Sequence, residues 1–417
     1  MASGEAIALN ILYINHYAGS LDMGMEFRPF YFAREWQKMG HKVRIVAASF
    51  SHLRKRNPSE KKDFEIQMID GIEYQWIKTG EYEGNGVARA KTMFEFCGKL
   101  NLNARKIAKE FMPDFVISSS TYPLDTYPAQ RIAKIAGCRY IHEAHDLWPL
   151  TLTEIGGMSS TNPFVIVLAI AERSAYSNAD KVVSLFPLAY KHMLTHGMQS
   201  MDKFVCIPNG IVIDDWKSPE SMPEEHSKAL DKLREEGKFI VMYLGGHALS
   251  NALDVLLDAA EETAADENIV YVLVGKGAEK ERLIRSAHER GLDNVVFLPP
   301  VEKICVPAVL QKADALYVGA ASSPIYRFGV SLNKLYDYMM AGVPIINGVD
   351  APNDDVAEAE CGITIKSDDS QALVNAIKEI KSMTQEERQQ MGTKGHIYVT
   401  QKYDYRVLAE TFINSIV

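Results

Sequence analysis

Short apolar runs alternate with longer amphipathic stretches along the first half of the chain. Residues 8–15 (ALNILYIN) form a run of strand length, and residues 27–39 repeat apolar positions with the period of a helix. Residues 42–48 (KVRIVAA) form the next strand-like run. Further strands are expected at residues 115–119, 139–143, 181–184 and 204–208. Strands separated by helix-length segments are typical of βαβ units, because a parallel crossover needs roughly a dozen residues or more.

The same alternation starts again in the second half. Residues 239–244 (FIVMYL) form a first strand, and a helix pattern follows over residues 252–264. The later strands are expected at residues 270–274, 295–298, 315–318, 343–346 and 363–365. Residues 210–238, rich in Pro, Asp, Glu and Ser, indicate a linker and a charged helix. We therefore expect two α/β domains of Rossmann-like, doubly wound type, residues 1–215 and 216–397.

The strand pattern also predicts where ligands bind. Open parallel sheets bind ligands at the carboxyl ends of their strands, beside the point where the strand order reverses. Two such domains in tandem are expected to face each other across a central cleft, with one ligand for each half. The residues of a site are therefore sought in the loops that follow the strands.

Composition narrows the classes of function and the compartment. The chain has 417 residues and a formal net charge of −9, which disfavours a nucleic-acid partner because such binding rests on Lys and Arg. Its 5 cysteines are widely spaced without a CxxC pair, so we expect thiols in a reducing compartment and no metal site. No secretory signal is evident, and no apolar run reaches the roughly 18 residues that span a bilayer. We expect a cytoplasmic protein.

Glycine-rich loops follow the first strand of each half. In the first half, Gly19 and Gly24 lie in the sequence HYAGSLDMGM, where glycine lets the backbone approach a substrate. An ordinary tight turn explains them as well, and the GxGxxG spacing of dinucleotide sites is missing. In the second half, Gly245, Gly246 and His247 come where an α/β domain binds phosphates through backbone N–H groups. His247 is a candidate donor to a phosphate, or it simply lies in a turn.

A second loop of the same half places a lysine between glycines. Lys276 and Gly277 belong to the sequence GKG after the strand at residues 270–274. The lysine is long enough to reach a phosphate, and the glycines let the loop pass close to a base. A solvated turn lysine is the alternative interpretation.

The segment RFGVSLNKLYDYMMAGVP is the most informative of the chain. Small and polar residues lead into a helix of about ten residues that ends at Gly342. Ser331 or Asn333 is suited to cap this helix, so that the free N–H groups of its first turn point toward an anion. Lys334 opposes the helix dipole unless a phosphate is bound there, and Asp337 is suited to accept hydrogen bonds from a ribose. A capped surface helix with a Lys334–Asp337 ion pair is the alternative.

Polar and titratable residues also cluster after the strand at residues 139–143. His145 and Asp146 lie in the sequence HEAHDLWP, at a strand end where residues of a cleft belong. Both are candidates to contact a transferred group or a developing charge. His142 and His145 are only weak support for zinc, because no other ligand is spaced to join them.

With these motifs in order, the whole chain resembles the retaining GT-B glycosyltransferases of family 4. The string SLNKLYDYMMAGVPII is similar to the family's SPNKLFEYMAAGKPVI, and the GKG loop stands where the family has GDG or GEG. The glycines after the first strand of each half and the turn at residues 207–210 agree with it. MEFRPFYFAREWQKMGHKV and HDLWP resemble the bacterial aminosugar transferases that include the fucosaminyltransferase of O-antigen assembly.

This resemblance implies a retaining transfer of a sugar, an N-acetylated aminosugar in that branch, during synthesis of a cell-surface polysaccharide. The C-terminal half is expected to bind the nucleotide sugar, UDP being the commonest donor. The N-terminal half is expected to bind a glycan or lipid-linked acceptor at the inner membrane face. By position in the motifs, Asp337 is expected at the ribose, Lys334 at the diphosphate and His145 near the transferred sugar.

The resemblance and the loops together give a full set of expected site residues. The catalytic set is His145, Asp146 and Lys334, with no metal and no cofactor besides the nucleotide sugar. The donor-binding set is Gly245, Gly246, His247, Lys276, Gly277, Gly329, Ser331, Leu332, Asn333, Lys334 and Asp337. The substrate loops contribute Gly19, Gly24 and Arg327.

Two positions depart from the family pattern. Gly329 stands where family members have the first of two acidic residues, so backbone groups or Arg327 are expected to contact the donor sugar instead. Gly246, His247 and Ala248 stand where an Arg and a Lys often follow the first strand of the second half. The sugar and its phosphate contacts are therefore left open.

Other functions and contacts remain open from the sequence. A nucleotide-sugar 2-epimerase would use the same scaffold without an acceptor, and a non-catalytic protein would bind a nucleotide or sugar without turnover. A helical tail over residues 398–417 is expected to cross back to the first domain, as in this fold. Residues 164–170 and 54–56 are candidates for membrane contact, although a buried helix and a solvated basic loop explain them equally.

Overall fold

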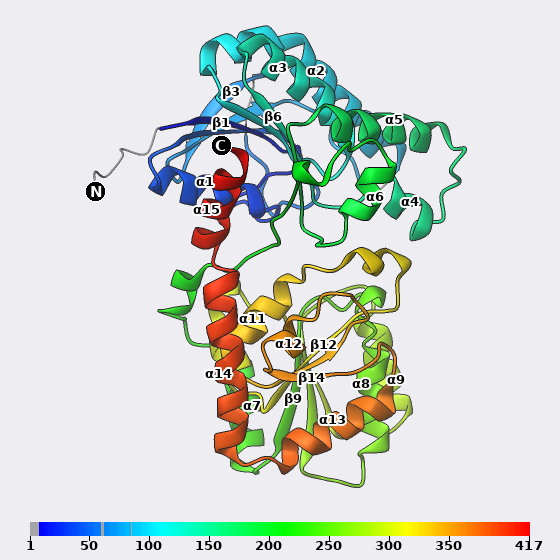
Figure 1. Cartoon of the computed structure of the whole chain (residues 1–417). Helices are drawn as coiled ribbons and strands as arrows, with labels where there is room; N and C mark the ends of the chain where they lie inside the picture. Colours follow the sequence, from blue (N-terminus) through cyan, green and yellow to red (C-terminus); the bar gives the residue numbers. More distant parts are fainter. Residues whose placement is uncertain (1–7, 60–61, 85) are drawn as a thin grey trace. The chain divides into compact units, whose positions relative to one another are not determined.

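The structure, a computed structural model, describes residues 8–59, 62–84 and 86–417. The chain divides into two compact units, Met1–Pro208 with Tyr405–Val417, and Asn209–Asp404 (Figure 1). The division therefore falls after Pro208 and not near residue 215, because the chain beyond it bonds within the second unit. The Asn209 N–H donates to Ser331 Oγ at 2.8 Å, and the Ile211 N–H donates to Tyr403 O at 2.8 Å.

The first unit contains a mainly parallel sheet. Its strands run in the order β3-β4-β2-β1-β5-β6-β7-β8, and only β3 and β4 pair antiparallel. The strand order reverses between β1 and β5, which is where such a sheet binds its ligands. The strands are β1 Asn10–Ile14, β2 Lys42–Ala48, β3 Glu65–Ile69, β4 Ile72–Ile77, β5 Phe115–Ser118, β6 Arg139–Ala144, β7 Lys181–Ser184 and β8 Phe204–Cys206.

The β3–β4 hairpin is an element that the sequence analysis missed. Its two-residue turn is Asp70-Gly71, and both residues have positive φ, 49° and 81°. An Asp-Gly pair between two runs of β-forming residues is the usual sequence signal of such a turn. The hairpin adds an edge to a sheet whose other strands follow the βαβ pattern, so the main fold is unaffected.

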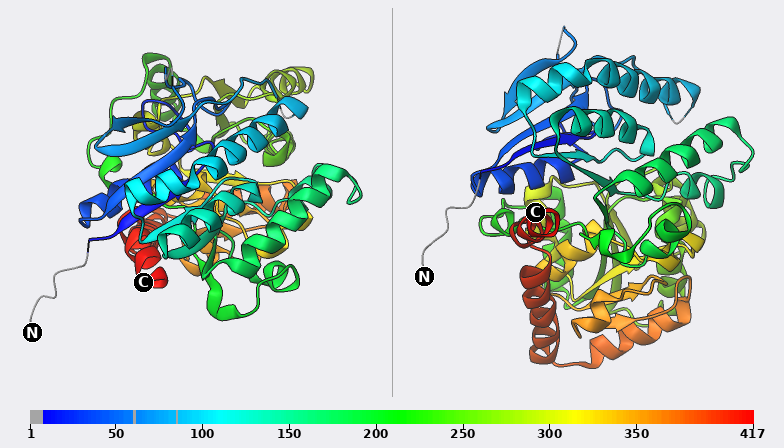
Figure 2. Two further views of the ribbon diagram at one scale, coloured as in Figure 1. Left: turned by 90° about the horizontal axis from the view of Figure 1, so that it is seen from above. Right: turned by 45° about the horizontal axis from the view of Figure 1, so that its top comes forward.

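Helices cover the first sheet, and the last helix of the chain is one of them. In α15, Ala409 O accepts a hydrogen bond from Trp36 Nε1 of α1 at 3.1 Å, and the Phe412 ring lies 5.2 Å from that indole. Helices α2 and α3 lie side by side in both figures (Figures 1 and 2). The helices are α1 Arg28–Lys38, α2 Val87–Phe111, η1 Pro123–Asp125, α3 Thr126–Ala136, α4 Leu150–Glu154, α5 Pro163–Asn178, α6 Tyr190–Thr195, η2 Met201–Lys203 and α15 Tyr405–Ile416.

The second unit contains an all-parallel sheet. Its order is β11-β10-β9-β12-β13-β14, and the order reverses between β9 and β12. The strands are β9 Phe239–Leu244, β10 Ile269–Val274, β11 Val295–Leu298, β12 Ala315–Gly319, β13 Ile345–Gly348 and β14 Gly362–Thr364. The helices are η3 Ile213–Trp216, α7 Glu224–Glu235, η4 Leu249–Asn251, α8 Asp254–Glu262, α9 Lys280–Glu289, η5 Lys303–Cys305, α10 Val306–Leu310, η6 Pro324–Phe328, α11 Asn333–Ala341, α12 Asp355–Glu358, α13 Ser370–Ser382 and α14 Gln385–Lys402.

Alternate residues of β9 enter two different cores. Ile240 and Met242 pack with α7, α10, α11 and α14, whereas Val241 and Tyr243 pack with α8, α9 and α13. Helices therefore cover both faces of the sheet, as the continuous apolar run of β9 predicts. Both units are Rossmann-like, doubly wound α/β domains, as expected from the sequence.

The tail differs from the single helix expected over residues 398–417. Helix α14 ends at Lys402, and the Tyr403 ring stacks on Tyr336 with centroids 4.5 Å apart. The Tyr403 hydroxyl also donates to Asp355 at 2.6 Å. These contacts keep the chain in the second unit as far as Asp404, and a separate helix, α15, begins after it. Among the described helices, none combines the length and the apolar character that a bilayer-spanning segment needs.

Candidate functional site

Two loops of the second unit pack against each other at the carboxyl ends of β9 and β10. A Cβ on Gly275 would lie 1.9 Å from Gly245 O, and one on Gly277 would lie 2.1 Å from His247 O. Both glycines also have positive φ, 148° and 159°. The His247 N–H donates to Lys276 O at 2.8 Å and joins the loops further. The glycines that the sequence singled out thus allow two backbones to meet at the edge where phosphates bind in such folds.

His247 does not take the outward position expected of a phosphate donor. Its side chain is buried, and neither ring nitrogen has a hydrogen-bond partner within the described chain. Burial, with smaller contributions from Lys280 and Lys334, lowers the pKa of the imidazole to about 4. The ring lies beneath Gly275, whose Cβ position is 3.3 Å from Nε2. A neutral imidazole still offers one N–H donor, so the phosphate contact expected of His247 stays a prediction.

Lys334 lies beside these loops, as the motif predicts. Its Nζ donates to Tyr243 Oη at 2.9 Å and also to Asn251 Oδ1, and it lies 4.8 Å from the centre of the Tyr243 ring. Tyr243 and Asn251 in turn both donate to Gly246 O, at 2.8 Å and 2.9 Å. The ammonium is therefore held over the glycine loop by neutral groups. Burial lowers the pKa of Lys334 to about 8.

This pKa predicts a pH dependence of anion binding. Below pH 8 Lys334 is already protonated, and above it the neutral form prevails, so the affinity for a nucleoside diphosphate is expected to be level below pH 8 and to fall above it. Calorimetric titration with UDP on both sides of pH 8 measures this. In Lys334→Arg, whose guanidinium stays charged, the fall should vanish. The same fall in both proteins would contradict the assignment.

The start of α11 is held in place differently from the expectation. Its N-cap is Leu332, which makes no side-chain cap, and Asn333 is the exposed first residue of the helix. Ser331 Oγ cannot serve as cap, since it accepts from the Asn209 N–H at 2.8 Å and contacts Tyr336 Oη at 3.1 Å. The capping role predicted for Ser331 or Asn333 is wrong. An uncapped first turn leaves backbone N–H groups for an external acceptor.

A tyrosine fixes α11 to the end of β9. Tyr338 Oη accepts from the Leu244 N–H at 2.8 Å and donates to Leu244 O at 3.1 Å. The ring is buried, so the helix cannot turn without breaking both bonds. The first turn of α11 and its lysine thereby keep a defined position beside Gly245 and Gly246.

Asp337 points toward a different lysine from the one considered in the sequence. Both of its carboxylate oxygens accept from Lys303 Nζ at 2.5 Å, and no Lys334–Asp337 pair is found. Lys303 lies in η5, and its side chain is 54% exposed, so it can move aside. A ribose hydroxyl at this carboxylate would compete with the Lys303 ammonium. The sequence analysis missed Lys303 because no motif surrounds it.

The remaining predicted residues of this unit lie in nearby loops. Gly329 is buried with φ of 104°, a conformation that favours glycine. Arg327 is exposed, donates to Pro324 O at 2.5 Å and lies 4.4 Å from the centre of the Phe328 ring. Lys276 is exposed at the GKG turn. None of these contacts assigns a ligand to Gly329, Arg327 or Lys276.

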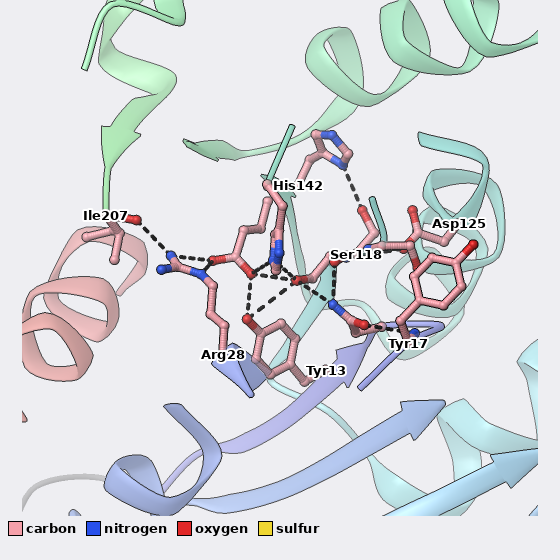
Figure 3. A network of polar contacts seen from close by, with 12 residues as sticks. Tyr13, Tyr17, Arg28, Ser118, Asp125, His142 and Ile207 are labelled. Carbon is pink, nitrogen blue, oxygen red and sulfur yellow. Dashed lines mark hydrogen bonds and ion pairs between the residues drawn. The ribbon is translucent and has the colours of Figure 1, made fainter. Parts of the chain in front are cut away.

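The first unit holds a buried polar network where β1, β5 and β6 end (Figure 3). Glu143 is its centre: Oε1 accepts from Arg28 Nη2 at 2.8 Å, and Oε2 accepts from Tyr13 Oη at 2.5 Å and Ser119 Oγ at 2.6 Å. His145 Nε2 lies 2.7 Å from Ser119 Oγ and 3.1 Å from Glu143 Oε2. The predicted histidine is thus oriented by two side chains from neighbouring strand ends.

The electrostatics of this network keep Glu143 ionised. Burial alone would raise its pKa, but Arg28, His145 and the hydrogen bonds outweigh it and hold the pKa well below its usual range. Arg28 also donates to Ile207 O at 2.7 Å and Pro208 O at 2.6 Å. Glu143 is therefore a fixed negative charge behind His145, and not a proton donor.

Asp146 has a positioning role that the sequence did not suggest. Its Oδ1 accepts from the Leu147 N–H at 2.8 Å and from Thr151 Oγ1 at 2.7 Å. These bonds hold the loop that enters α4. Asp146 therefore helps to shape the loop that carries His145, and the catalytic role expected of it stays a prediction.

Gly19 and Gly24 serve the closure of their own loop. A Cβ on Gly19 would lie 1.9 Å from Gly24 O, and Gly24 has φ of 94°. The Gly19 N–H donates to Glu26 O at 2.8 Å. Both residues are buried, so the tight-turn alternative describes them better than direct contact with a substrate.

A cavity of the second unit lies away from all these residues. It has a volume of about 460 Å³ and opens at the amino ends of β12 and β13, beside Asp314 and Pro344. Arg234 and Arg388 line it, and none of the predicted site residues does. Because parallel sheets bind ligands at the other end of their strands, this cavity is not the candidate donor site.

Comparisons with known proteins agree with this arrangement. Residues 226–397 match the family described as glycosyl transferases group 1, and residues 24–210 match the glycosyl transferase 4-like domain. A curated relative is the putative colanic acid biosynthesis glycosyl transferase WcaI of Escherichia coli strain K12. It is 26% identical over 195 residues, which cover 45% of this chain and 46% of the relative, so the match spans about half the relative's length.

Solved structures of similar fold cover nearly the whole chain. Anabaena Alr3699/HepE in complex with UDP has a TM-score of 0.68 at 15% identity, over 98% of this chain and 99% of that one. WaaG, a glycosyltransferase involved in lipopolysaccharide biosynthesis, has a TM-score of 0.65 at 16% identity, with the same coverage. At these sequence identities, the similarity to the solved structures shows a shared fold and nothing beyond it.

Proposed function

The chain belongs to the group 1 glycosyl transferases, with a glycosyl transferase 4-like domain before the group 1 domain, and on that premise we propose its reaction. The proposed reaction moves a sugar from a UDP-linked donor to a hydroxyl of a glycan or lipid-linked acceptor, with retention at the anomeric carbon. The sugar proposed is an N-acetylated aminosugar, and the product a cell-surface polysaccharide. WcaI and WaaG, described by their roles in colanic acid and lipopolysaccharide biosynthesis, support this direction.

The observation that carries the donor assignment is the environment of Lys334. A partly buried ammonium held by the neutral side chains of Tyr243 and Asn251, beside an uncapped helix start and two glycine loops, is suited to a diphosphate. As the bond to the sugar breaks, charge grows on the β-phosphate. Lys334 and the first-turn N–H groups of α11 would stabilise that charge, without a metal at this site. Asp337, released from Lys303, would accept from the ribose.

In the first unit, His145 is the residue proposed to contact the transferred sugar. Its Nε2 is committed to Ser119 and Glu143, which leaves Nδ1 as the atom directed at substrate. The ionised Glu143 behind it favours a proton on Nε2, so Nδ1 would act as an acceptor. Asp146 acts indirectly, by holding the loop.

A product assay separates this proposal from its rivals. The chain is incubated with each of several UDP-sugars, with and without a lipid extract that contains lipid-linked glycans, and products are read by NMR. Release of UDP that depends on the extract, with an anomeric coupling equal to the donor's, supports the transferase. If a C2 epimer of the donor formed without the extract, the chain would be an epimerase and not a transferase. Binding of UDP with no turnover of any donor would favour the non-catalytic protein.

We further propose that α5 contacts a membrane surface where a lipid-linked acceptor would reside. Ile166, Val167 and Ile170 of this helix are exposed, and Phe94 of α2 lies beside Phe164, their ring centroids 6.4 Å apart. Exposed apolar side chains on one helix face favour insertion at a bilayer interface.

A vesicle flotation assay tests this contact. The wild-type chain is expected to float with vesicles of anionic phospholipid, whereas the double variant Ile166→Ser, Ile170→Ser is expected to stay unbound. Equal flotation of both proteins would refute the contact.

A further inference from the structure

A cluster of metal-ligating side chains lies in the first unit, away from the network of Glu143. Glu172 belongs to α5, His192 to α6, and His196 follows the last residue of α6. One donor atom of each residue lies within 4.8 Å of the others. Glu172 and His192 are buried, and His196 is exposed to solvent. We propose that these three residues bind a divalent transition-metal ion, with zinc as the representative ion.

The first support is the placement of the two histidines. His196 follows α6, four positions after His192, and the two rings are stacked, with their centroids 3.9 Å and their planes 23° apart. Two histidines at this spacing are a recurring pair of zinc ligands when both rings turn toward one ion. Glu172 completes a set of two imidazoles and one carboxylate, which zinc accepts in tetrahedral sites that keep a fourth position for water.

The second support is the tautomer of His196. Its Nδ1 lies 2.9 Å from His192 O and 2.9 Å from Thr195 Oγ1. The Thr195 hydroxyl donates to His192 O at 2.7 Å, so its oxygen is able to accept. Nδ1 therefore carries the proton, and Nε2 keeps the lone pair that a metal needs. A ligating histidine whose other N–H donates to a backbone carbonyl is the usual outer arrangement of a metal site.

The carboxylate is oriented in the same way. Tyr176 Oη donates to Glu172 Oε1 at 3.2 Å, and His192 Nε2 lies 2.7 Å from the same oxygen. On a tetrahedral zinc the ligand atoms are roughly 3.4 Å apart, given metal–ligand bonds of about 2.0–2.2 Å. To bind the ion, the distance between Glu172 Oε1 and His192 Nε2 has to lengthen by some tenths of an ångström. The exposed His196 ring has to turn inward as well. The ion would replace the proton shared by Glu172 and His192.

The sequence pattern of the cysteines, and of His142 with His145, had indicated no metal site. Glu172 and His192 are 20 positions apart and meet only when α5 packs near α6. The proposed site does not touch the donor or the sugar, so it does not rest on the proposed transferase activity. Its expected effect is to join the two helices and stabilise the first unit by linkage.

Zinc titration of the untagged, chelator-stripped full chain tests the proposal. One equivalent is expected to bind and to raise the Tm, and chelator should reverse the rise. His196→Gln, a change at an exposed position, should abolish both effects with an unchanged far-UV circular dichroism spectrum. His288→Gln, which alters an exposed histidine of the second unit, should leave both effects intact.

Cobalt substitution adds a readout of ligand type. Nitrogen and oxygen ligands give visible d–d bands, whereas a cysteine ligand adds an intense sulfur-to-cobalt band in the near ultraviolet. The proposal expects d–d bands that disappear in His196→Gln and in Glu172→Gln, without the sulfur band. Three results would overturn it: no binding to the wild-type chain, stoichiometric binding that survives in His196→Gln, or a sulfur band that marks a cysteine site.

Discussion

Lys334→Ala is expected to lower kcat of the proposed transfer about 10²–10³-fold, the usual cost of removing one group that stabilises charge in a transition state. The affinity for UDP should fall as well, because the substitution removes the cation held over the Gly246 loop by Tyr243 and Asn251. UDP binding is measured by calorimetry, and donor turnover by released UDP. The loss should exceed that of any single lysine replaced elsewhere in the unit.

The control for this variant is Lys312→Ala. Lys312 pairs with Asp231 at 2.6 Å and is 35% exposed, and it lies beside the amino end of β12, away from the donor loops. The Lys312→Ala variant should bind UDP and turn over the donor as the wild-type chain does. If Lys334→Ala matches Lys312→Ala in both measurements, then Lys334 is not at the diphosphate, and the donor assignment fails.

The second large effect is expected in the first unit, from Arg28→Met. Glu143 has a fully buried carboxylate, and removing the guanidinium leaves it without its cation. Breaking a buried ion pair by deleting one partner costs about 3–5 kcal/mol, and the bonds to Ile207 O and Pro208 O are lost too. The free energy of unfolding is read by urea titration with tryptophan fluorescence, to which Trp36 and Trp76, both buried in this unit, contribute.

A double variant separates the charge from the packing. In Arg28→Met with Glu143→Gln, no charge is left unpaired, so part of the lost stability should return. UDP affinity, a property proposed for the second unit, should stay unchanged in both variants. Losses that simply add in the double variant would show that the two side chains are not coupled, contrary to their ion pair at 2.8 Å.

The fold was largely predictable because its information is local. Each expected strand is a short apolar run whose neighbours are helical, and β1, β9 and β10 are buried on both faces, so the run itself marks them. The β3–β4 hairpin was not predicted, because it departs from the βαβ spacing of the other strands and its signal is the single pair Asp70-Gly71. The break between α14 and α15 at Tyr403 was not predictable from the local sequence, since it depends on the contacts of Tyr403 with Tyr336 and Asp355.

The residues of the candidate site also divide into those that the local sequence predicted and those whose contacts depend on the fold. Lys334 and the loops of Gly245 and Gly275 were found because they lie inside a contiguous motif. The capping role given to Ser331 was wrong, and the contact of Asp337 with Lys303 was not foreseen, because the partners Asn209 and Lys303 are distant in sequence. A motif places a side chain on an element, but it does not say which distant group has already taken its hydrogen bonds.

The Arg28–Glu143 pair shows the limit most clearly. Its members are 115 positions apart, and each looks ordinary where it stands: an arginine opening a helix and a glutamate ending a strand. One signal was present, since Arg28 precedes the buried run Pro29–Ala33 on a helix that covers the sheet. A charge at such a position implies a buried partner, but only the fold identifies Glu143.

The central claim, that the carboxyl ends of β9 and β10 hold the nucleotide of the donor, is tested most directly by a crystal structure of the chain with UDP. The account predicts the diphosphate against the first turn of α11 with an oxygen on Lys334 Nζ, and the ribose at Asp337 in place of Lys303. UDP found instead in the first unit, or in the cavity beside Arg234 and Arg388, would contradict it.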